Sequence, residues 1–166
     1  MEIIKAFLPL IGVVIGSALT IAGTIYQRRS SAREDHRKLL REKLEYLFLQ
    51  LSALERWMED AGKNAMRVRF GKQPNLPKPS DESPMPQIDM LVRLYFPSLR
   101  PGSEALSSAA EKLRKGLFTY YADVLSRTEL PSQDKFTEFV TQPSTELDHL
   151  RVELLKQVEQ EARKDV

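Results

Sequence analysis

Two histidines, His36 and His149, are the residues best suited to act as general bases or metal ligands in this 166-residue chain. Each directly follows an aspartate, in the stretches EDHRK and LDHLR. Adjacent residues on a helix do not face one another, so neither Asp–His pair forms a catalytic dyad or a pair of ligands. The chain has no cysteine, which excludes thiolate metal sites, cysteine nucleophiles and disulfides.

Signatures of other chemistry are missing as well. The sequence has no glycine-rich phosphate loop, no HExxH, no GxSxG and no calcium-binding loop. The carboxylates are spread over charged stretches, without the apolar setting that would shift their protonation. Basic residues gather only in residues 28–43, so no broad basic face is available for nucleic acid. The sequence therefore predicts a non-enzymatic protein with no cofactor, no metal and no nucleic-acid partner.

An apolar run near the N-terminus is the clearest functional feature. Residues 6–27 carry no charged side chain, and a helix of that length rises about 33 Å, close to the hydrocarbon thickness of a bilayer. We therefore expect a transmembrane anchor within residues 1–27. The alternatives are a cleaved signal peptide and a soluble apolar helix, but a signal peptide has a basic start and a shorter apolar stretch.

The basic juxtamembrane segment, residues 28–43, predicts the orientation of this anchor. It holds seven Arg or Lys against three Asp or Glu, and positive residues stay on the cytoplasmic side. The expected location is the bacterial inner membrane, with a single pass, the N-terminus outside and the rest cytoplasmic. The arginines predicted to contact lipid headgroups are Arg28, Arg29, Arg33 and Arg37. The alternative is that they act only as a topology signal on a solvated helix.

Small residues recur inside the predicted span and predict self-association. They are Gly12, Gly16, Thr20 and Gly23, and such a ridge lets two helix backbones approach closely in lipid. Glycine is also common in membrane helices without any such role, which is the alternative. With no charge inside the span, a single copy offers no ion pathway.

A long amphipathic helix is predicted for residues 31–70. Its apolar residues step alternately by four and three, which is typical of a helix with one continuous packing seam. This helix-packing seam consists of Leu40, Leu44, Leu47, Leu51, Leu54 and Met58, and it continues through Ala61, Ala65 and Val68. Bulky residues beside the seam favour a helix buried on several sides over a two-stranded coiled coil. Ser31 and Glu34 fit a capping box, and the pattern leaves open whether the helix breaks near Ser30.

The remainder of the chain predicts further helices. Residues 71–87 hold five prolines and read as a linker. Residues 88–166 are predicted to supply the other helices of a cytoplasmic bundle. Within them, residues 88–97 fit either a helix or a strand, and we prefer a short helix because no partner strand is evident. The predicted fold class is all-α, with one transmembrane helix and a helical bundle.

The stretches LIGVVIGSALTIAGTIYQRRSSAREDHRKLLREKLEYL and LVRLYFPSL resemble bacterial single-pass membrane proteins that have a Gly-rich N-terminal anchor and a cytoplasmic helical domain. The resemblance implies no activity and no functional residues. We predict a membrane-anchored adaptor, scaffold or regulatory subunit that binds the lipid bilayer, further copies of itself and a protein partner of unknown identity. The alternatives are a membrane effector, such as a toxin or phage-defence component whose oligomers perturb the bilayer, and a membrane-tethered enzyme.

Overall fold

The computed structural model describes residues 2–70, 83–126 and 132–164, without the side chains of residues 2–19, 21, 22 and 125. Every regular element in these ranges is helical, and none of the described residues forms a strand. The prediction of an all-α chain is confirmed to that extent. The chain divides into two compact units, Met1–Arg41 and Glu42–Val166.

Helix α1 runs without interruption over Glu2–Arg69, 68 residues. The segment around Ser30 is rich in Arg, Ala, Glu, Lys and Leu, all good helix formers, which explains why the helix does not break there. Ser31 therefore lies inside the helix, and its predicted role in a capping box is wrong because a cap must precede the first helical turn.

The predicted transmembrane segment falls within α1. Among the described residues, no helix combines the length and the apolarity needed to cross a membrane. Most side chains of residues 6–27 lie outside the described part of the structure. The predicted span therefore stays a prediction.

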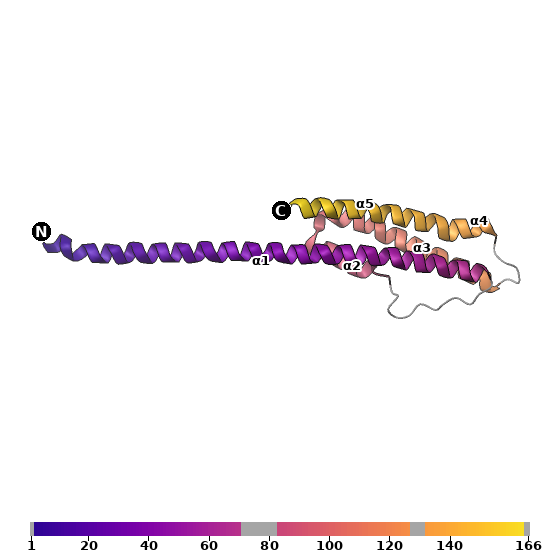
Figure 1. The fold of residues 1–166 in the computed structure, drawn as a ribbon, viewed down its shortest axis with the longest axis horizontal. Helices are drawn as coiled ribbons and strands as arrows, with labels where there is room; N and C mark the ends of the chain where they lie inside the picture. Colours follow the sequence, from indigo (N-terminus) through magenta and orange to yellow (C-terminus); the bar gives the residue numbers. More distant parts are fainter. Residues whose placement is uncertain (1, 71–82, 127–131, 165–166) are drawn as a thin grey trace. The chain divides into compact units, whose positions relative to one another are not determined.

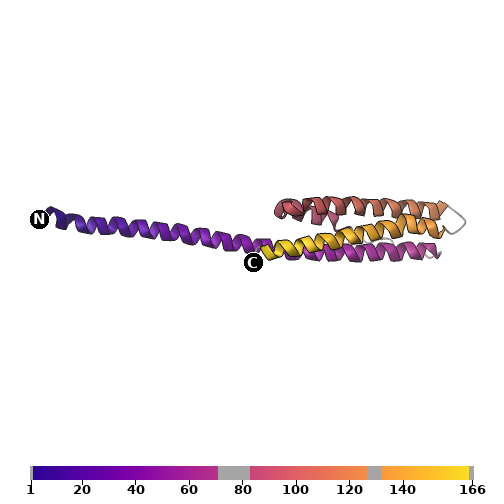
Figure 2. The same cartoon turned by 90° about the horizontal axis from the view of Figure 1, so that it is seen from above.

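The second unit is a helical bundle formed by the C-terminal part of α1 and the helices that follow it (Figure 1). These are α2 (Met85–Tyr95), the 3-10 helix η2 (Pro97–Leu99), α3 (Arg100–Ser126), α4 (Gln133–Phe136), the π-helical turn η3 (Thr137–Thr141) and α5 (Gln142–Lys164). Helices α3 and α5 lie side by side in both views (Figure 2). They are antiparallel, since Ser98, just before α3, bonds to Glu161 near the end of α5, and Lys112 of α3 pairs with Glu146 near the start of α5.

Residues from all of these helices fill the core of the bundle. Its completely buried side chains, none more than 2% exposed, include Leu47, Leu51 and Leu54 of α1, Ile88, Leu91 and Val92 of α2, Leu106, Leu113 and Tyr120 of α3, and Leu147 and Leu154 of α5. Burying a side chain of this size contributes about 1.5–3 kcal/mol. The core is therefore what holds α1 to the rest of the unit.

The ambiguous segment 88–97 is mostly helical. In α2, Ile88, Leu91 and Val92 are buried, whereas Met90 and Leu94 are at least half exposed, as expected for a helical period. The helix ends before Pro97, because the residue before a proline disfavours helical geometry. Most of the predicted linker, residues 71–87, lies outside the described residues, but α2 already begins at Met85, so the predicted end of the linker is wrong.

A close approach between η3 and α3 depends on Gly116. A Cβ atom placed on Gly116 would collide with the backbone oxygen of Phe139. That contact involves backbone on both sides, so no side-chain rotation relieves it. The π-helical turn can lie against α3 only because residue 116 has no side chain.

We predict that Gly116→Ala destabilises the bundle, by about 1–3 kcal/mol for an overpacked contact. Gly62→Ala is the matched control, because Gly62 also lies inside a helix and nothing comes within 4 Å of its Cβ position. That control should instead stabilise the helix by about 0.5–1 kcal/mol. Thermal and urea unfolding of the two variants measure both effects, and equal stabilities would contradict the assigned contact.

Candidate interaction surfaces

The described residues contain no cluster suited to metal or acid–base chemistry. No group of three or more His, Asp or Glu residues in those ranges could hold a metal ion. His36 is exposed, and His149 lies on the surface with its Nε2 3.8 Å from the Glu153 carboxylate. The surfaces of the two units are described next.

The residues predicted to mediate self-association are only partly described. The surroundings of Gly12 and Gly16 lie outside the described side chains. Thr20 is exposed, and its carbonyl accepts a hydrogen bond of 2.8 Å from the Thr24 hydroxyl. A Cβ atom added to Gly23 would meet nothing within 4 Å. A glycine within a helix costs about 0.5–1 kcal/mol of stability relative to alanine. No contact among the described residues requires a glycine at position 23.

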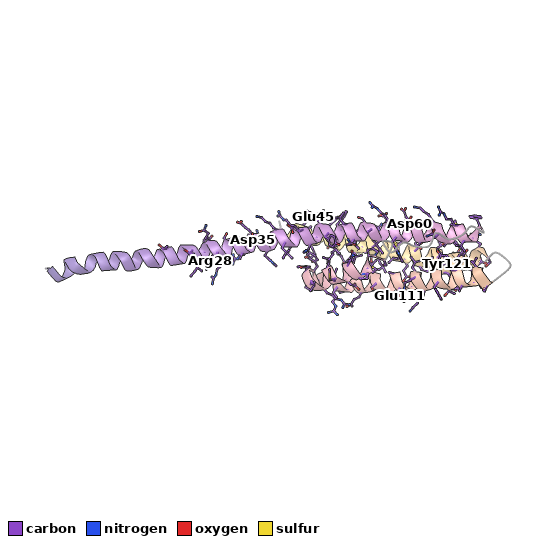
Figure 3. All side chains as sticks on the ribbon, turned by 90° about the horizontal axis from the view of Figure 1, so that it is seen from below. Arg28, Asp35, Glu45, Asp60, Glu111 and Tyr121 are labelled. Atoms are coloured by element: carbon purple, nitrogen blue, oxygen red, sulfur yellow. The ribbon has the colours of Figure 1, made fainter. Side chains whose placement is uncertain are left out.

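The first unit exposes every described side chain up to residue 39. These include the apolar Ile25 and Tyr26, which are 48% and 78% exposed. The predicted headgroup residues Arg28, Arg29, Arg33 and Arg37 are also exposed, and Arg28 and Asp35 project away from the helix (Figure 3). None of these arginines pairs with an acid among the described residues. Most helix stability in proteins comes from tertiary packing, and the described side chains of residues 20–39 show none.

All residues of the predicted helix-packing seam except Leu40 lie in the bundle. Five of its residues are buried, namely Leu44, Leu47, Leu51, Leu54 and Met58, and Leu40 is partly exposed. The seam is covered by helices of the same chain. It is therefore not a free surface for a two-stranded coiled coil.

A buried arginine links α5 to α1 within the bundle. The Arg151 side chain is only 9% exposed, and its guanidinium lies 3.2 Å from Glu55 of α1 and 2.8 Å from Asp148 of its own helix. Both carboxylates remain about half exposed. The sequence held a signal for this residue, since Arg151 stands at an inward position between Leu147 and Leu154.

We predict an asymmetry between the two sides of this ion pair. Arg151→Met keeps an apolar side chain in place and leaves both acids in contact with water, so its cost should stay below about 1 kcal/mol. The double variant Glu55→Gln, Asp148→Asn leaves a buried guanidinium without a carboxylate, which should cost about 3 kcal/mol or more. Urea unfolding of both variants tests this difference, and a larger loss for Arg151→Met would contradict it.

A buried tyrosine without a hydrogen-bond partner lies where α3 meets α4. The hydroxyl of Tyr120 is the one buried side-chain polar atom among the described residues that has no partner. Its ring packs edge-on against Phe136 at 5.6 Å, and the guanidinium of Arg69 lies 5.5 Å from the centre of the Phe136 ring. Burial raises the pKa of Tyr120, and the nearby charge of Arg69 partly opposes that rise. Burial and the neighbouring Tyr120 also raise the pKa of Tyr121.

We predict that Tyr120→Phe leaves stability at neutral pH unchanged or raises it, because it removes an unsatisfied buried hydroxyl. Since the pKa of folded Tyr120 is raised, the unfolded chain loses its proton first, and the wild type should lose stability as the pH rises above about 10. In the variant this loss should be smaller. Chemical unfolding at pH 7 and between pH 9 and 11 measures both effects, and a marked loss of stability at pH 7 would indicate a hydrogen bond that the structure does not show.

Large apolar side chains are also exposed on the bundle. They are Tyr46, Phe48, Leu49 and Met66 of α1, Phe70 just after it, Met90 and Leu94 of α2, Phe118 of α3 and Val152 of α5. Exposed apolar residues are normal on a protein surface. Charged residues of α3 pair locally, as Glu111 does with Arg114.

No family model, no curated protein and no solved structure matches this chain. The resemblance to single-pass membrane proteins with a helical cytoplasmic domain stays a prediction from the sequence.

Proposed function

We propose that the protein is a membrane-anchored, non-enzymatic interaction protein, an adaptor, scaffold or regulatory subunit that associates with further copies of itself. The observation that carries this proposal is the exposure of α1 throughout the described side chains of residues 20–39. A helix whose apolar residues have no packing partner in their own chain requires a lipid or protein surface.

A lipid surface fits the sequence that precedes these residues. The uncharged run of residues 6–27 has the length of a membrane span, and Tyr26 lies at its end, where aromatic residues favour the membrane interface. The arginines that follow favour a cytoplasmic location for the bundle. We therefore propose insertion in the bacterial inner membrane with the N-terminus outside.

Lipid headgroups suit some of the predicted arginines better than others. The headgroup region is about 5–8 Å deep on each side of the hydrocarbon core. Along the helix axis, Arg29 and Arg33 lie within about 8 Å of Arg28, whereas Arg37 lies about 13 Å away. Arg28, Arg29 and Arg33 are the proposed headgroup contacts, and Arg37 is better placed for another partner.

The bundle would then serve as the cytoplasmic binding domain. Its core is made of buried apolar side chains from every helix of the unit. In this proposal the bundle acts through the protein that it holds at the membrane.

We predict that the wild type stays with the membrane fraction after alkaline extraction. Val14→Arg combined with Ile15→Arg should release it, because an arginine at the centre of a span costs about 2.5–3.5 kcal/mol. The matched control is Leu94→Arg combined with Phe118→Arg, two exposed sites on the bundle, which should leave membrane association intact. In spheroplasts, added protease should cut the bundle only after lysis. Release of the wild type by extraction would contradict the anchor, and cleavage before lysis would contradict the orientation.

A further inference from the structure

The π-helical turn η3 leads directly into α5, and Pro143 stands at the second residue of that helix. We infer that Pro143 and Gly116 act together to set the rotation of α4 in the bundle. Pro143 displaces the carbonyl group of Phe139 from the helix, and Gly116 of α3 leaves the space that this carbonyl occupies. The inference concerns the bundle alone and does not depend on the proposed membrane anchor.

A proline inside a helix acts on the carbonyl group four residues earlier, which here belongs to Phe139. Pro143 has no N–H to donate to that carbonyl, and its ring clashes with it. The chain is nevertheless helical from Gln133 to Lys164. Just before the proline, the N–H of Gln142 bonds to the carbonyl of Thr137, five residues back instead of four. The helix therefore accommodates Pro143 by taking one extra residue into the preceding turn.

The carbonyl oxygen of Phe139 is also the atom that lies against α3. A Cβ atom on Gly116 would collide with this oxygen, so the approach requires a glycine at that position. In a regular α-helix the same carbonyl would point along the helix axis, toward the residue four positions later. The group that Pro143 displaces is thus the group that Gly116 accommodates, although the two residues belong to different helices.

The extra residue in the turn also rotates α4 relative to α5. In an unbroken helix Phe136 would lie in line with Leu147, since about three full turns separate them. One extra residue turns Phe136 about 100° from that line, toward the side on which Arg151 reaches α1. The Phe136 ring there lies 5.6 Å from the ring of Tyr120 and 5.5 Å from the guanidinium of Arg69.

This rotation lets α4 join three helices at one end of the bundle. Helix α4 lies at the end where α1 terminates, as both views show (Figures 1 and 2). Phe136 is only 7% exposed, and the neighbouring Lys135 forms an ion pair of 2.9 Å with Asp123 of α3. The π-helical turn therefore determines whether this end of the bundle is closed over Tyr120.

The first experiment is a double-mutant cycle, measured by urea unfolding of the full-length protein in mild detergent. Gly116→Ala should lower the folding equilibrium constant about fivefold to hundredfold in the wild-type background. In Pro143→Ala the carbonyl of Phe139 can return to the helix, because residue 143 then has an N–H. The same Gly116→Ala substitution should therefore cost at least about threefold less in that background.

Gly62→Ala is the matched control in this cycle, because nothing lies within 4 Å of its Cβ position. It should change the equilibrium constant by the same factor with and without Pro143→Ala. Equal effects of Gly116→Ala in the two backgrounds would overturn the inference. So would an equally large change in the effect of Gly62→Ala, since Pro143→Ala would then act on the whole bundle.

The second experiment tests the rotation of α4 without any change at Gly116. Tetranitromethane nitrates accessible tyrosines, and fragmentation in a mass spectrometer assigns the modified residue. In the wild type Tyr46, which is 42% exposed, should react, whereas the buried Tyr120 should be protected. Pro143→Ala should raise the nitration rate of Tyr120 at least about tenfold and leave that of Tyr46 unchanged, because Phe136 then turns away.

Circular dichroism shows whether Pro143→Ala keeps its helix content, as expected for a substitution that restores an α-helical hydrogen bond. Continued protection of Tyr120 in a fully helical Pro143→Ala variant would contradict the assigned role of the π-helical turn. A loss of helix content in this variant would contradict it as well, because the inferred change converts one helical form into another.

Discussion

The bundle depends on covering the apolar seam of α1. Leu47, Leu51 and Leu54 are completely buried. On an isolated α1 helix the same three side chains would be exposed to water. The burial of such side chains is the main favourable term in the stability of a small domain. Helices α2, α3 and α5 bury this seam. Arg151 of α5 also forms an ion pair with Glu55 of α1.

The first unit presents the opposite situation. Its described side chains up to residue 39 face solvent, so no tertiary packing contributes to the stability of the helix there. One helix therefore carries two kinds of surface. The seam residues from Leu44 onward are buried within their own chain, whereas Ile25 and Tyr26 are exposed in the described part of the structure. This contrast is the physical basis of the proposed binding function.

Periodic features of the fold could be predicted from the sequence. The seam of α1 was visible as alternating steps of four and three, and the helical nature of residues 88–95 followed from the lack of a partner strand. Contacts between distant elements could not be predicted. From the sequence, Gly116 is only a residue that destabilises a helix, because its contact with Phe139 is not visible there. The unpaired hydroxyl of Tyr120 likewise depends on how α4 packs against α3. The periodicity of a segment carries no information on contacts with distant segments.

For the candidate surfaces, the sequence predicted the charged and small residues, and the structure added that the helix continues through Ser30.

The distance along the chain between Glu55 and Arg151 also affects how the protein is made. The seam of α1 is synthesised early, but α5, which helps to cover it, is synthesised last, roughly a hundred residues later. At a synthesis rate of about 5–20 residues per second, α5 emerges on the order of 5–20 seconds after the seam, and the seam stays partly uncovered during that time. During this interval the nascent chain exposes a leucine-rich surface close to the ribosome. The order of the helices in the gene thus creates a period in which chaperones, or a neighbouring nascent copy, can reach a surface that the finished protein hides.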